Sequence, residues 1–253
     1  MPPPQEIRVI PVSFAQEIRR GDDVIEKLRT ELRHQKMSLR DGDVLVIKHK
    51  IISKTEGQMV ELESVKPSRM ATSWARQSGA DARVVELALQ ESERIVRKKQ
   101  GVLITQTRQG LVCANSGVDA SNVNGGHSAV LLPRDPDGSA ARLRSQIKRQ
   151  IGVTVAVIIS DSFGRPWREG LTEVAIGIAG MKPLLDYRGK RDPHGYRLRG
   201  SYEAIADEVA CAAGLVCGKL NRTPFCIVRG FKYQRGQGSA LELIRAKEND
   251  LFR

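Results

Sequence analysis

The chain is poor in aromatic residues and in cysteines. Phe, Trp and Tyr together account for 4% of its 253 residues, and no RNA-binding aromatic signature or helix-turn-helix pattern is present. The four cysteines form no CxxC pair and the four histidines are scattered, so the spacing of a zinc site is absent. We therefore expect reduced, mostly buried thiols, and the low aromatic content argues against a nucleic-acid partner.

Long apolar runs and nucleotide-binding signatures are also missing. No apolar stretch approaches the ~18 residues that a membrane helix requires, and the opening MPPPQEIRVIPV lacks the layout of a secretory signal. A Walker motif, a GxGxxG motif and the signatures of Ser-His-Asp or Cys-His catalysis are absent as well. We expect a cytoplasmic protein with no membrane partner, and neither a P-loop nor a Rossmann site.

Positive charge is in clear excess. Lys and Arg number 41 against 29 for Asp and Glu, which gives a formal net charge of +12. Such a balance favours anionic partners, and nucleic acid, nucleotides and phosphorylated substrates all remain open at this point. The basic residues are spread along the chain instead of forming blocks, which speaks against nucleic acid.

Strand and helix patterns alternate along the chain without the strict repetition of a doubly wound sheet. This predicts a mixed α/β (α+β) fold. We expect a single domain over residues 1–253, with a soft boundary near the polar, turn-rich segment 182–200. The predicted strands lie within 6–14, 41–57, 101–107, 110–118, 153–160 and 224–231. The predicted helices are 23–35 (capped by Asp22), 68–78, 81–97, 138–150 and 203–220.

Three polar clusters follow apolar strands, at Lys54, at Asp119 with Asn122, and at Asp161 with Ser162. Because α/β proteins build sites at the carboxyl ends of strands, three such clusters are more informative than one. Asp119 and Asp161 would suit Mg²⁺ or Mn²⁺, which takes one or two carboxylates and fills its other positions with water and phosphate oxygens. The plainer alternative for each aspartate is a turn or a helix cap.

The segment DSFGRPWREG, residues 161–170, follows a run apolar enough to be buried on both faces. Arg165 and Arg168 offer planar forks that suit a phosphate or a carboxylate. Pro166 and Trp167 between them predict a stiff, shaped loop, in which the ring either stacks on a ligand or anchors the loop to the core. A solvated surface loop is the plainer alternative.

Four longer stretches closely resemble the coenzyme F420-0:L-glutamate ligase family, and the resemblance spans nearly the whole chain. They are GDVLVIKHKIISKTEG, GVLITQTRQGLVCANSGVDASNV, DSFGRPWREGLTEVAIGIAGMKPLLDYRG and ELIRAKENDLFR. The resemblance implies a GTP-dependent ligase that adds L-glutamate to coenzyme F420-0, or its dehydro form, through an acyl phosphate and then adds γ-linked glutamates. It also implies an intertwined homodimer, K⁺, and Mg²⁺ or Mn²⁺ at two sites.

The resemblance assigns roles to particular positions. Asp119 and Asp161 match ligands of a first metal ion, and Ser162 matches a hydroxyl beside a second. Arg165, Arg168 and Glu169 match the strongest motif, and we expect the arginines to bind phosphate or substrate carboxylate while Glu169 orients them. The expected GTP contacts are Ala15, Gln16, Glu17, Ile18, His49, Lys50, Lys54, Asn122, Val216, Cys217, Gly218 and Lys219.

Three positions depart from the family pattern: Gln16 stands where proline is frequent, Gln109 where histidine is common, and Lys219 where some members carry a metal-binding Gln or Glu. A protonated lysine cannot bind a metal ion. We expect no fused nitroreductase-like domain, which some relatives carry. Two other functions stay open: a related GTP-dependent amide ligase acting on another carboxylate, and a basic nucleotide-binding or nucleic-acid-binding protein without catalysis.

Overall fold

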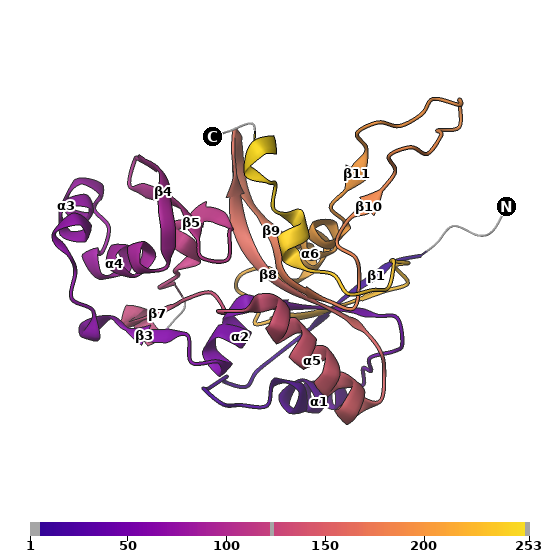
Figure 1. Cartoon of the computed structure of the whole chain (residues 1–253). Coiled ribbons are helices and arrows are strands. Elements are labelled where there is room, and N and C mark those ends of the chain that lie inside the picture. The colour runs from indigo at the N-terminus through magenta and orange to yellow at the C-terminus, as the bar shows by residue number, and fades with distance from the viewer. Residues whose placement is uncertain (1–5, 122–123, 251–253) are drawn as a thin grey trace.

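A five-stranded sheet forms the centre of the molecule, in the order β1-β12-β2-β8-β9 (Figure 1). The computed structural model describes residues 6–121 and 124–250. β2 and β8 run parallel, and the other neighbouring pairs in the sheet are antiparallel. The strands are β1 (Arg8–Val12), β2 (Val44–Lys48), β8 (Ala156–Arg165), β9 (Arg168–Ala179) and β12 (Phe225–Arg229). The mixed α/β fold expected from the sequence is confirmed.

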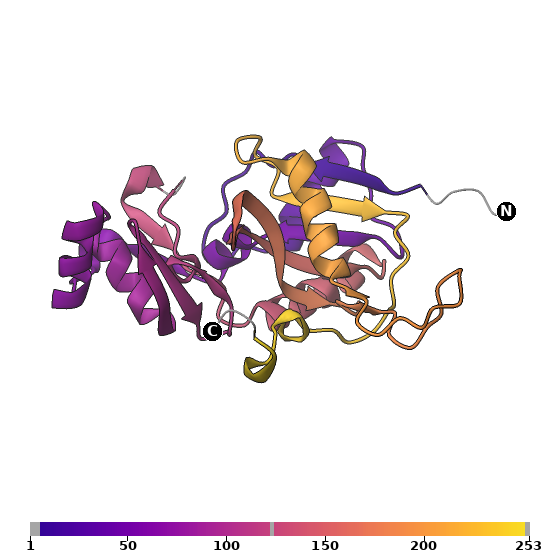
Figure 2. The same cartoon turned by 90° about the horizontal axis from the view of Figure 1, so that it is seen from above.

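Helices cover both faces of this sheet (Figures 1 and 2). One face packs against α1 (Val24–His34), α2 (His49–Thr55) and α5 (Pro136–Ile151), and the other against α6 (Ile205–Cys217). Successive residues of a strand point to opposite faces, so Leu45 contributes to the first core and Val46 to the second. This double burial explains why β2 and the first residues of β8, Ala156 to Ile159, are apolar runs.

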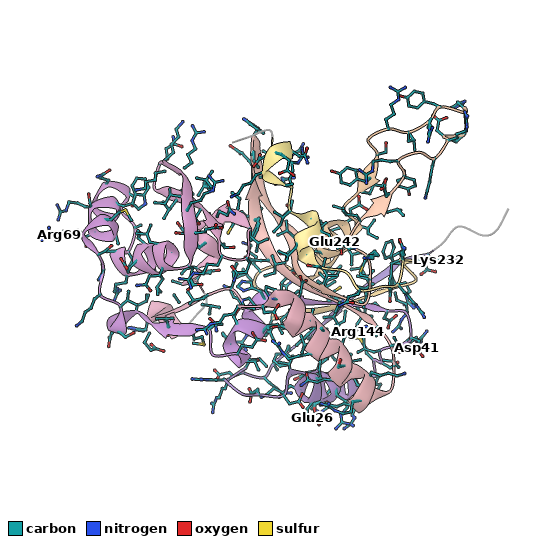
Figure 3. All side chains as sticks on the ribbon, in the orientation of Figure 1. Glu26, Asp41, Arg69, Arg144, Lys232 and Glu242 are labelled. Atoms are coloured by element: carbon teal, nitrogen blue, oxygen red, sulfur yellow. The ribbon has the colours of Figure 1, made fainter. Side chains whose placement is uncertain are left out.

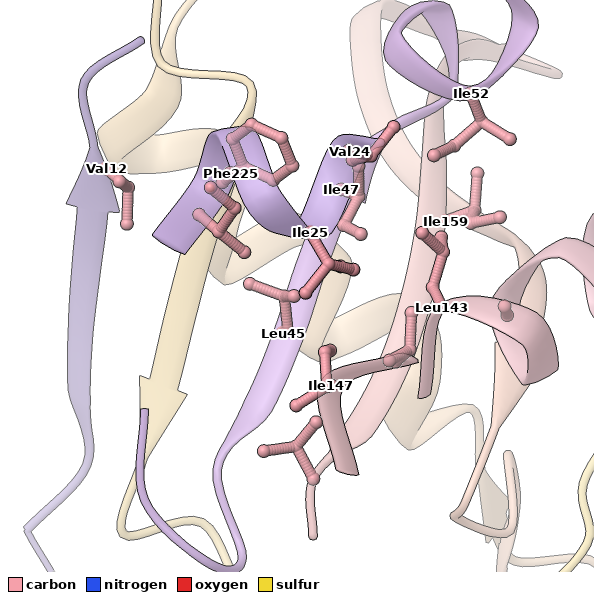
Figure 4. Close-up of a cluster of buried hydrophobic side chains, with 14 of the residues drawn as sticks. Val12, Val24, Ile25, Leu45, Ile47, Ile52, Leu143, Ile147, Ile159 and Phe225 are labelled. Atoms are coloured by element: carbon pink, nitrogen blue, oxygen red, sulfur yellow. The ribbon is translucent and has the colours of Figure 1, made fainter. Parts of the chain in front are cut away.

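The larger core lies between the sheet and helices α1 and α5 (Figure 4). Ile25 and Ile147 from the helices meet Ile47 and Ile159 from the strands, and all four side chains are fully buried. Burying one such side chain contributes roughly 1.5 to 3 kcal/mol of hydrophobic free energy. This core therefore fixes the ends of β2 and β8, from which the polar residues of the candidate site project.

Residues 59–131 form a lobe beside the sheet, at the left of Figure 1. It has its own small apolar cores, with Leu62, Leu87 and Leu103 among their buried members. Its elements are β3 (Met59–Glu61), α3 (Arg69–Ser78), α4 (Ala82–Gln90), β4 (Ser92–Lys99), β5 (Val102–Thr107), β6 (Val112–Ala114) and β7 (Ser128–Val130). β3 pairs with β7, and β4, β5 and β6 form a separate sheet.

Two hairpins project from the body of the molecule. The first is the outer part of β8 and β9, which turns at residues 166–167. The second is an arm between β10 (Leu185–Asp186) and β11 (Tyr202–Glu203), whose side chains point outward along its length (Figure 3). The segment 182–200, expected to be a soft boundary, holds most of this arm.

Several local predictions were wrong. The cap of α1 is Asp23, whose side chain accepts from the backbone N–H groups of Ile25 and Glu26, whereas Asp22 accepts from Arg19. The strand predicted within 41–57 ends at Lys48, where a helix begins. The helix predicted for 81–97 ends at Gln90 and is followed by strand β4. Residues 161–170 are the end of a hairpin and its turn instead of a loop.

The cysteines match the expectation, since all four are free thiols and three are buried. Basic side chains are spread over the surface, as Arg69 on the lobe and Lys232 on the opposite side show (Figure 3). Within residues 6–121 and 124–250, no helix combines the length and the hydropathy needed to cross a membrane.

Candidate functional site

A cavity of about 870 Å³ opens beside the carboxyl end of β2. Its walls are the loop 14–20 that precedes α1, the exposed side of α2, and the loop 218–224 between α6 and β12. Backbone hydrogen bonds join these walls: Phe14 N–H donates to the Arg222 carbonyl and Lys48 N–H to the Pro224 carbonyl, both at 2.9 Å. Phe14 also packs edge-on against Phe225, with ring centroids 5.3 Å apart.

The walls of the cavity are strongly cationic. Glu17 is the one carboxylate among its described lining residues. The lining cations are Arg19, Arg20, Lys48, Lys50, Lys54, Lys219 and Arg222. Positive groups that converge on one concave surface raise the local concentration of anions. The cavity therefore suits a polyanionic ligand such as a nucleoside triphosphate.

Asp119, in the lobe, contacts Lys50 of the cavity wall. Its Oδ2 lies 2.7 Å from Nζ of Lys50, and its Oδ1 accepts a 2.6 Å hydrogen bond from Ser121 N–H. Burial raises the pKa of Asp119, but the hydrogen bonds from Lys50 and Ser121 outweigh burial and hold that pKa below its usual value. The carboxylate is thus kept ionised, the form that binds a metal ion.

Asp161 approaches the start of α2 from the sheet. Its Oδ1 lies 3.3 Å from Nε2 of the buried His49, whose Nδ1 is 3.3 Å from Ser53 Oγ. Since burial and the nearby Asp161 charge both disfavour a thiolate, the pKa of the Cys113 thiol rises to about 12. Cys113 is therefore a protonated, structural thiol.

The two aspartates contact neighbouring residues of α2, Asp161 through His49 and Asp119 through Lys50. This brings both carboxylates to one end of a short helix. In the described part of the chain, no group of three or more His, Cys, Asp or Glu side chains is arranged to hold a metal ion. Asp119 and Asp161 are the two carboxylates at this end of α2 that could hold an ion of the Mg²⁺ type, which takes one or two carboxylates and completes its shell with phosphate oxygens and water.

Asp161 and Ser162 are successive residues of β8, so their side chains leave opposite faces of the sheet. Ser162 Oγ donates a 2.7 Å hydrogen bond to Glu173 Oε1 on the α6 face. Ser160 Oγ donates to Glu173 Oε2 at 2.9 Å, and Lys48 Nζ lies 2.5 Å from Glu173 Oε1. The side chains of Asp161 and Ser162 consequently belong to separate polar clusters.

The expected nucleotide contacts are largely brought together, although their roles stay predictions. His49 and Cys217 are buried, and neither they nor Val216 line the cavity. Asn122 lies outside the described residues. The expected contacts that line the cavity are Ala15, Gln16, Glu17, Ile18, Lys50, Lys54, Gly218 and Lys219.

The structure does not bring Arg165, Arg168 and Glu169 to this cavity. They are exposed at the tip of the β8–β9 hairpin, where Arg165 Nη2 donates a 3.1 Å hydrogen bond to the Glu169 carbonyl. Trp167 at the turn is 81% exposed, so its ring does not anchor the tip to the core.

Sequence reasoning missed several residues of the site, above all Lys48 and Glu173. Lys48 was missed because the predicted strand extended past it, although three polar residues in a row, Lys48, His49 and Lys50, after an apolar run indicate the end of a strand. Glu173 lies in a stretch that offers no local signal, because its partners come from β2 and β8.

Comparison with known proteins establishes the family to which this chain belongs. The family model described as F420-0:Gamma-glutamyl ligase matches residues 14–230, which include both loops of the cavity, both carboxylates of the lobe and sheet, and both hairpins. The chain belongs to the F420-0:gamma-glutamyl ligase family. The resemblance seen in the sequence is thereby confirmed.

Curated relatives within the F420-0:gamma-glutamyl ligase family match over most of the chain. A coenzyme F420:L-glutamate ligase of Methanopyrus kandleri is 42% identical over 252 residues and covers 98% of both chains. Proteins of the same name from Methanothermobacter thermautotrophicus and Methanocaldococcus jannaschii are 43% and 42% identical, over 92% and 85% of this chain and 93% and 86% of their own lengths. The similarity therefore extends beyond the site motifs to the whole fold.

Proposed function

We propose that this protein is a GTP-dependent ligase that joins L-glutamate to the terminal carboxylate of coenzyme F420-0 or its dehydro form, and then adds γ-linked glutamates. Family membership and the names of its relatives support the ligase chemistry. The observation that carries the nucleotide dependence is the cationic cavity of about 870 Å³. Its charge and size suit a nucleoside triphosphate.

The reaction has two parts. The γ-phosphoryl group of GTP passes to a carboxylate oxygen of the acceptor, which gives GDP and an acyl phosphate. The glutamate amine, after losing a proton, then attacks the carbonyl carbon, the carbon–oxygen bond to phosphate breaks, and inorganic phosphate leaves as the amide forms. Activation is required because a free carboxylate is a poor electrophile.

The residues of the cavity account for the first part. Lys50, held by Asp119, and Lys54 on the same helix neutralise phosphate charge as it develops. Asp119 and Asp161 would hold Mg²⁺ or Mn²⁺, which when bound polarises the phosphate oxygens. Ser162 lies with Glu173 on the other face, where a second ion is proposed; because Lys219 supplies no metal ligand, this second site has fewer donors.

The position of the β8–β9 hairpin supports the proposed homodimer. Arg165 and Arg168 suit a substrate carboxylate or phosphate, and Glu169 would orient them. All three are exposed and do not line the cavity of their own chain. A second copy that receives the hairpin would complete the site, and the two chains would then be intertwined. The expected K⁺ requirement stays a prediction.

The test is GDP release by the purified protein with GTP, Mg²⁺ or Mn²⁺, L-glutamate and coenzyme F420-0, with each component omitted in turn. We expect GDP release to require both the coenzyme precursor and the metal ion. Turnover that ignores the precursor would instead indicate an amide ligase acting on another carboxylate. Salt-dependent binding of nucleic acid without GTP turnover would indicate a binding protein.

A further inference from the structure

Glu173 of β9 is a charged residue enclosed beneath α6, with 9% of its surface exposed. Both carboxylate oxygens have partners: Ser160 donates to Oε2, Ser162 donates to Oε1, and the Lys48 ammonium group lies 2.5 Å from Oε1. The partners come from β2 and β8, the two strands that precede β9 in the order of the sheet. The charge is therefore fully satisfied at the end of the sheet nearest the cavity.

Helix α6 is shaped around this carboxylate. A Cβ atom added at Gly214, in the interior of α6, would lie 2.7 Å from Glu173 Cγ. Glycine lowers the stability of a helix interior. Its presence at position 214 is explained by the Glu173 side chain, which occupies the space that a larger residue would need. The thiol of Cys211, one turn earlier, donates to the Glu173 carbonyl at 3.1 Å. The side chain and the backbone of Glu173 are thus both held by direct contacts, from β2, β8 and α6.

A purely structural role explains this cluster poorly. An ion pair withdrawn from water recovers its desolvation cost only with good geometry, and well-packed apolar residues in its place are often as stable or more so. Most other side chains on this face are apolar, with Val46, Ile158 and Ala175 among them, and Asp207 of α6 accepts a 2.8 Å hydrogen bond from Ala175 N–H. The Glu173 carboxylate holds the Lys48 ammonium group in one place, and apolar residues could not do this.

Lys48 is the residue through which the cluster reaches the cavity. It is the last residue of β2, lines the cavity, and keeps 22% of its side chain exposed. An ammonium group has three donors, so contact with one carboxylate oxygen leaves donors for an anion. Lys50, two residues later, is held in the same manner by Asp119. The start of α2 therefore presents two ammonium groups to one cavity, each oriented by a carboxylate from a different strand or lobe.

We infer that Lys48 binds a phosphate group of the nucleotide in this cavity and that Glu173 is its positioning residue. The inference rests on the proposed function, since it names a contact within the same site. Orienting the ammonium group in advance avoids ordering a flexible side chain when the ligand binds. The side chain of Glu173 also holds Ser162, so one carboxylate links the cavity to the cluster on the α6 face.

The test measures binding of inorganic tripolyphosphate and of GTP by isothermal titration calorimetry, with thermal unfolding of every variant. Lys48→Met alone leaves Glu173 buried without a counter-charge and would destabilise the fold. The decisive variant is therefore Lys48→Met/Glu173→Gln, which removes both charges and keeps an acceptor for the serine hydroxyls. Asp43→Asn is the matched control, because Asp43 is 2% exposed and pairs with Arg229 at 2.7 Å at the opposite end of the sheet.

We expect the double variant to remain folded and to bind tripolyphosphate about 10- to 100-fold more weakly, the effect of one lost charge-assisted hydrogen bond. Glu173→Gln alone should weaken binding less, because the ammonium group stays but is no longer fixed. Asp43→Asn should lower the Tm and leave binding unchanged. Wild-type affinity in a folded double variant would overturn the inference alone. If the wild-type protein bound neither tripolyphosphate nor GTP, the proposed function would fail and the inference with it.

Discussion

Nζ of Lys50 lies 2.7 Å from Oδ2 of Asp119 and 3.0 Å from the Ser121 carbonyl oxygen, so one side chain of α2 joins the cavity to the lobe. The pairing has two effects. It keeps Asp119 ionised by lowering its pKa against the effect of burial, and it fixes an ammonium group at the cavity wall. The proposed metal ligand and the proposed phosphate-binding cation are thereby oriented by each other.

Removing either partner of this pair should impair the enzyme in a different way. We expect Lys50→Met to raise the KM for GTP about 10- to 100-fold, because a charge-assisted contact with phosphate is lost. Asp119→Asn should lower kcat by at least ~10-fold, because it removes a metal ligand as well as the anchor of Lys50. Steady-state kinetics with varied GTP measure both. Arg83→Met, which breaks an exposed pair with Asp81 on the lobe, is the control and should change neither constant.

The opposite directions of Asp161 and Ser162 predict distinct metal-binding defects. Asp161→Asn should weaken Mn²⁺ binding in the presence of GDP about 10-fold or more, because a carboxylate is replaced by a neutral amide. Ser162→Ala should leave that ion in place and disturb the Glu173 cluster instead. Electron paramagnetic resonance titration of Mn²⁺ distinguishes the two. Equal losses of the same ion in both variants would show that one ion contacts both side chains.

A site shared between two copies predicts rescue on mixing. Arg168→Ala should be inactive through its hairpin, and Lys50→Met should be nearly inactive through its cavity when the GTP concentration is kept well below the raised KM of that variant. If each site combines the cavity of one chain with the hairpin of the other, a mixed dimer retains one intact site. Co-refolding equal amounts should then restore about a quarter of wild-type activity, because about half of random dimers are mixed. Activity no higher than that of the separate variants would refute the shared site.

The cap of α1 predicts a pH effect on stability. Burial raises the pKa of Asp23, but hydrogen bonds from Glu26 N–H, Gln150 and Ile25 N–H outweigh it, so that pKa is lowered on folding. A lowered folded-state pKa contributes stability above the unfolded value of ~3.9, and this stability is lost as pH falls through the folded value. Asp23→Ala should cost about 1 kcal/mol at pH 7. Chemical denaturation should show that cost shrinking as the pH falls below the unfolded value of ~3.9.

Much of the fold could be predicted because its signals are local. The apolar run before Asp161 and the small-residue helix around Ala210 mark a doubly buried strand and a closely packed helix, and both are present. The boundaries failed where tertiary context overrides local pattern. Residues 92–97 carry helical spacing but pair with β5, and the strand ending at Lys48 gives way to a helix that packs Ile52 into the core.

The candidate site also contains residues that could be predicted from the sequence and residues that could not. Lys54 of α2 and Lys219 of the loop after α6 could be placed near a nucleotide from the resemblance, and the structure brings them to one cavity. The partners of Glu173 lie on other strands and could not be inferred from spacing. The hairpin tip was expected at the site, but one chain does not place it there. The residues of the tip carry the family motif, and their distance from the cavity follows from the length and direction of the β8–β9 hairpin, which local sequence spacing does not reveal.

The central claim is tested most directly by mass spectrometry of coenzyme F420-0 after incubation with the protein, GTP, Mg²⁺ and L-glutamate. The account predicts a product heavier by one glutamyl unit, then by further units, with one GDP formed for each bond and none without GTP. Unchanged coenzyme mass with the same protein folded and binding GTP, or glutamate addition that proceeds without any nucleoside triphosphate, would contradict it.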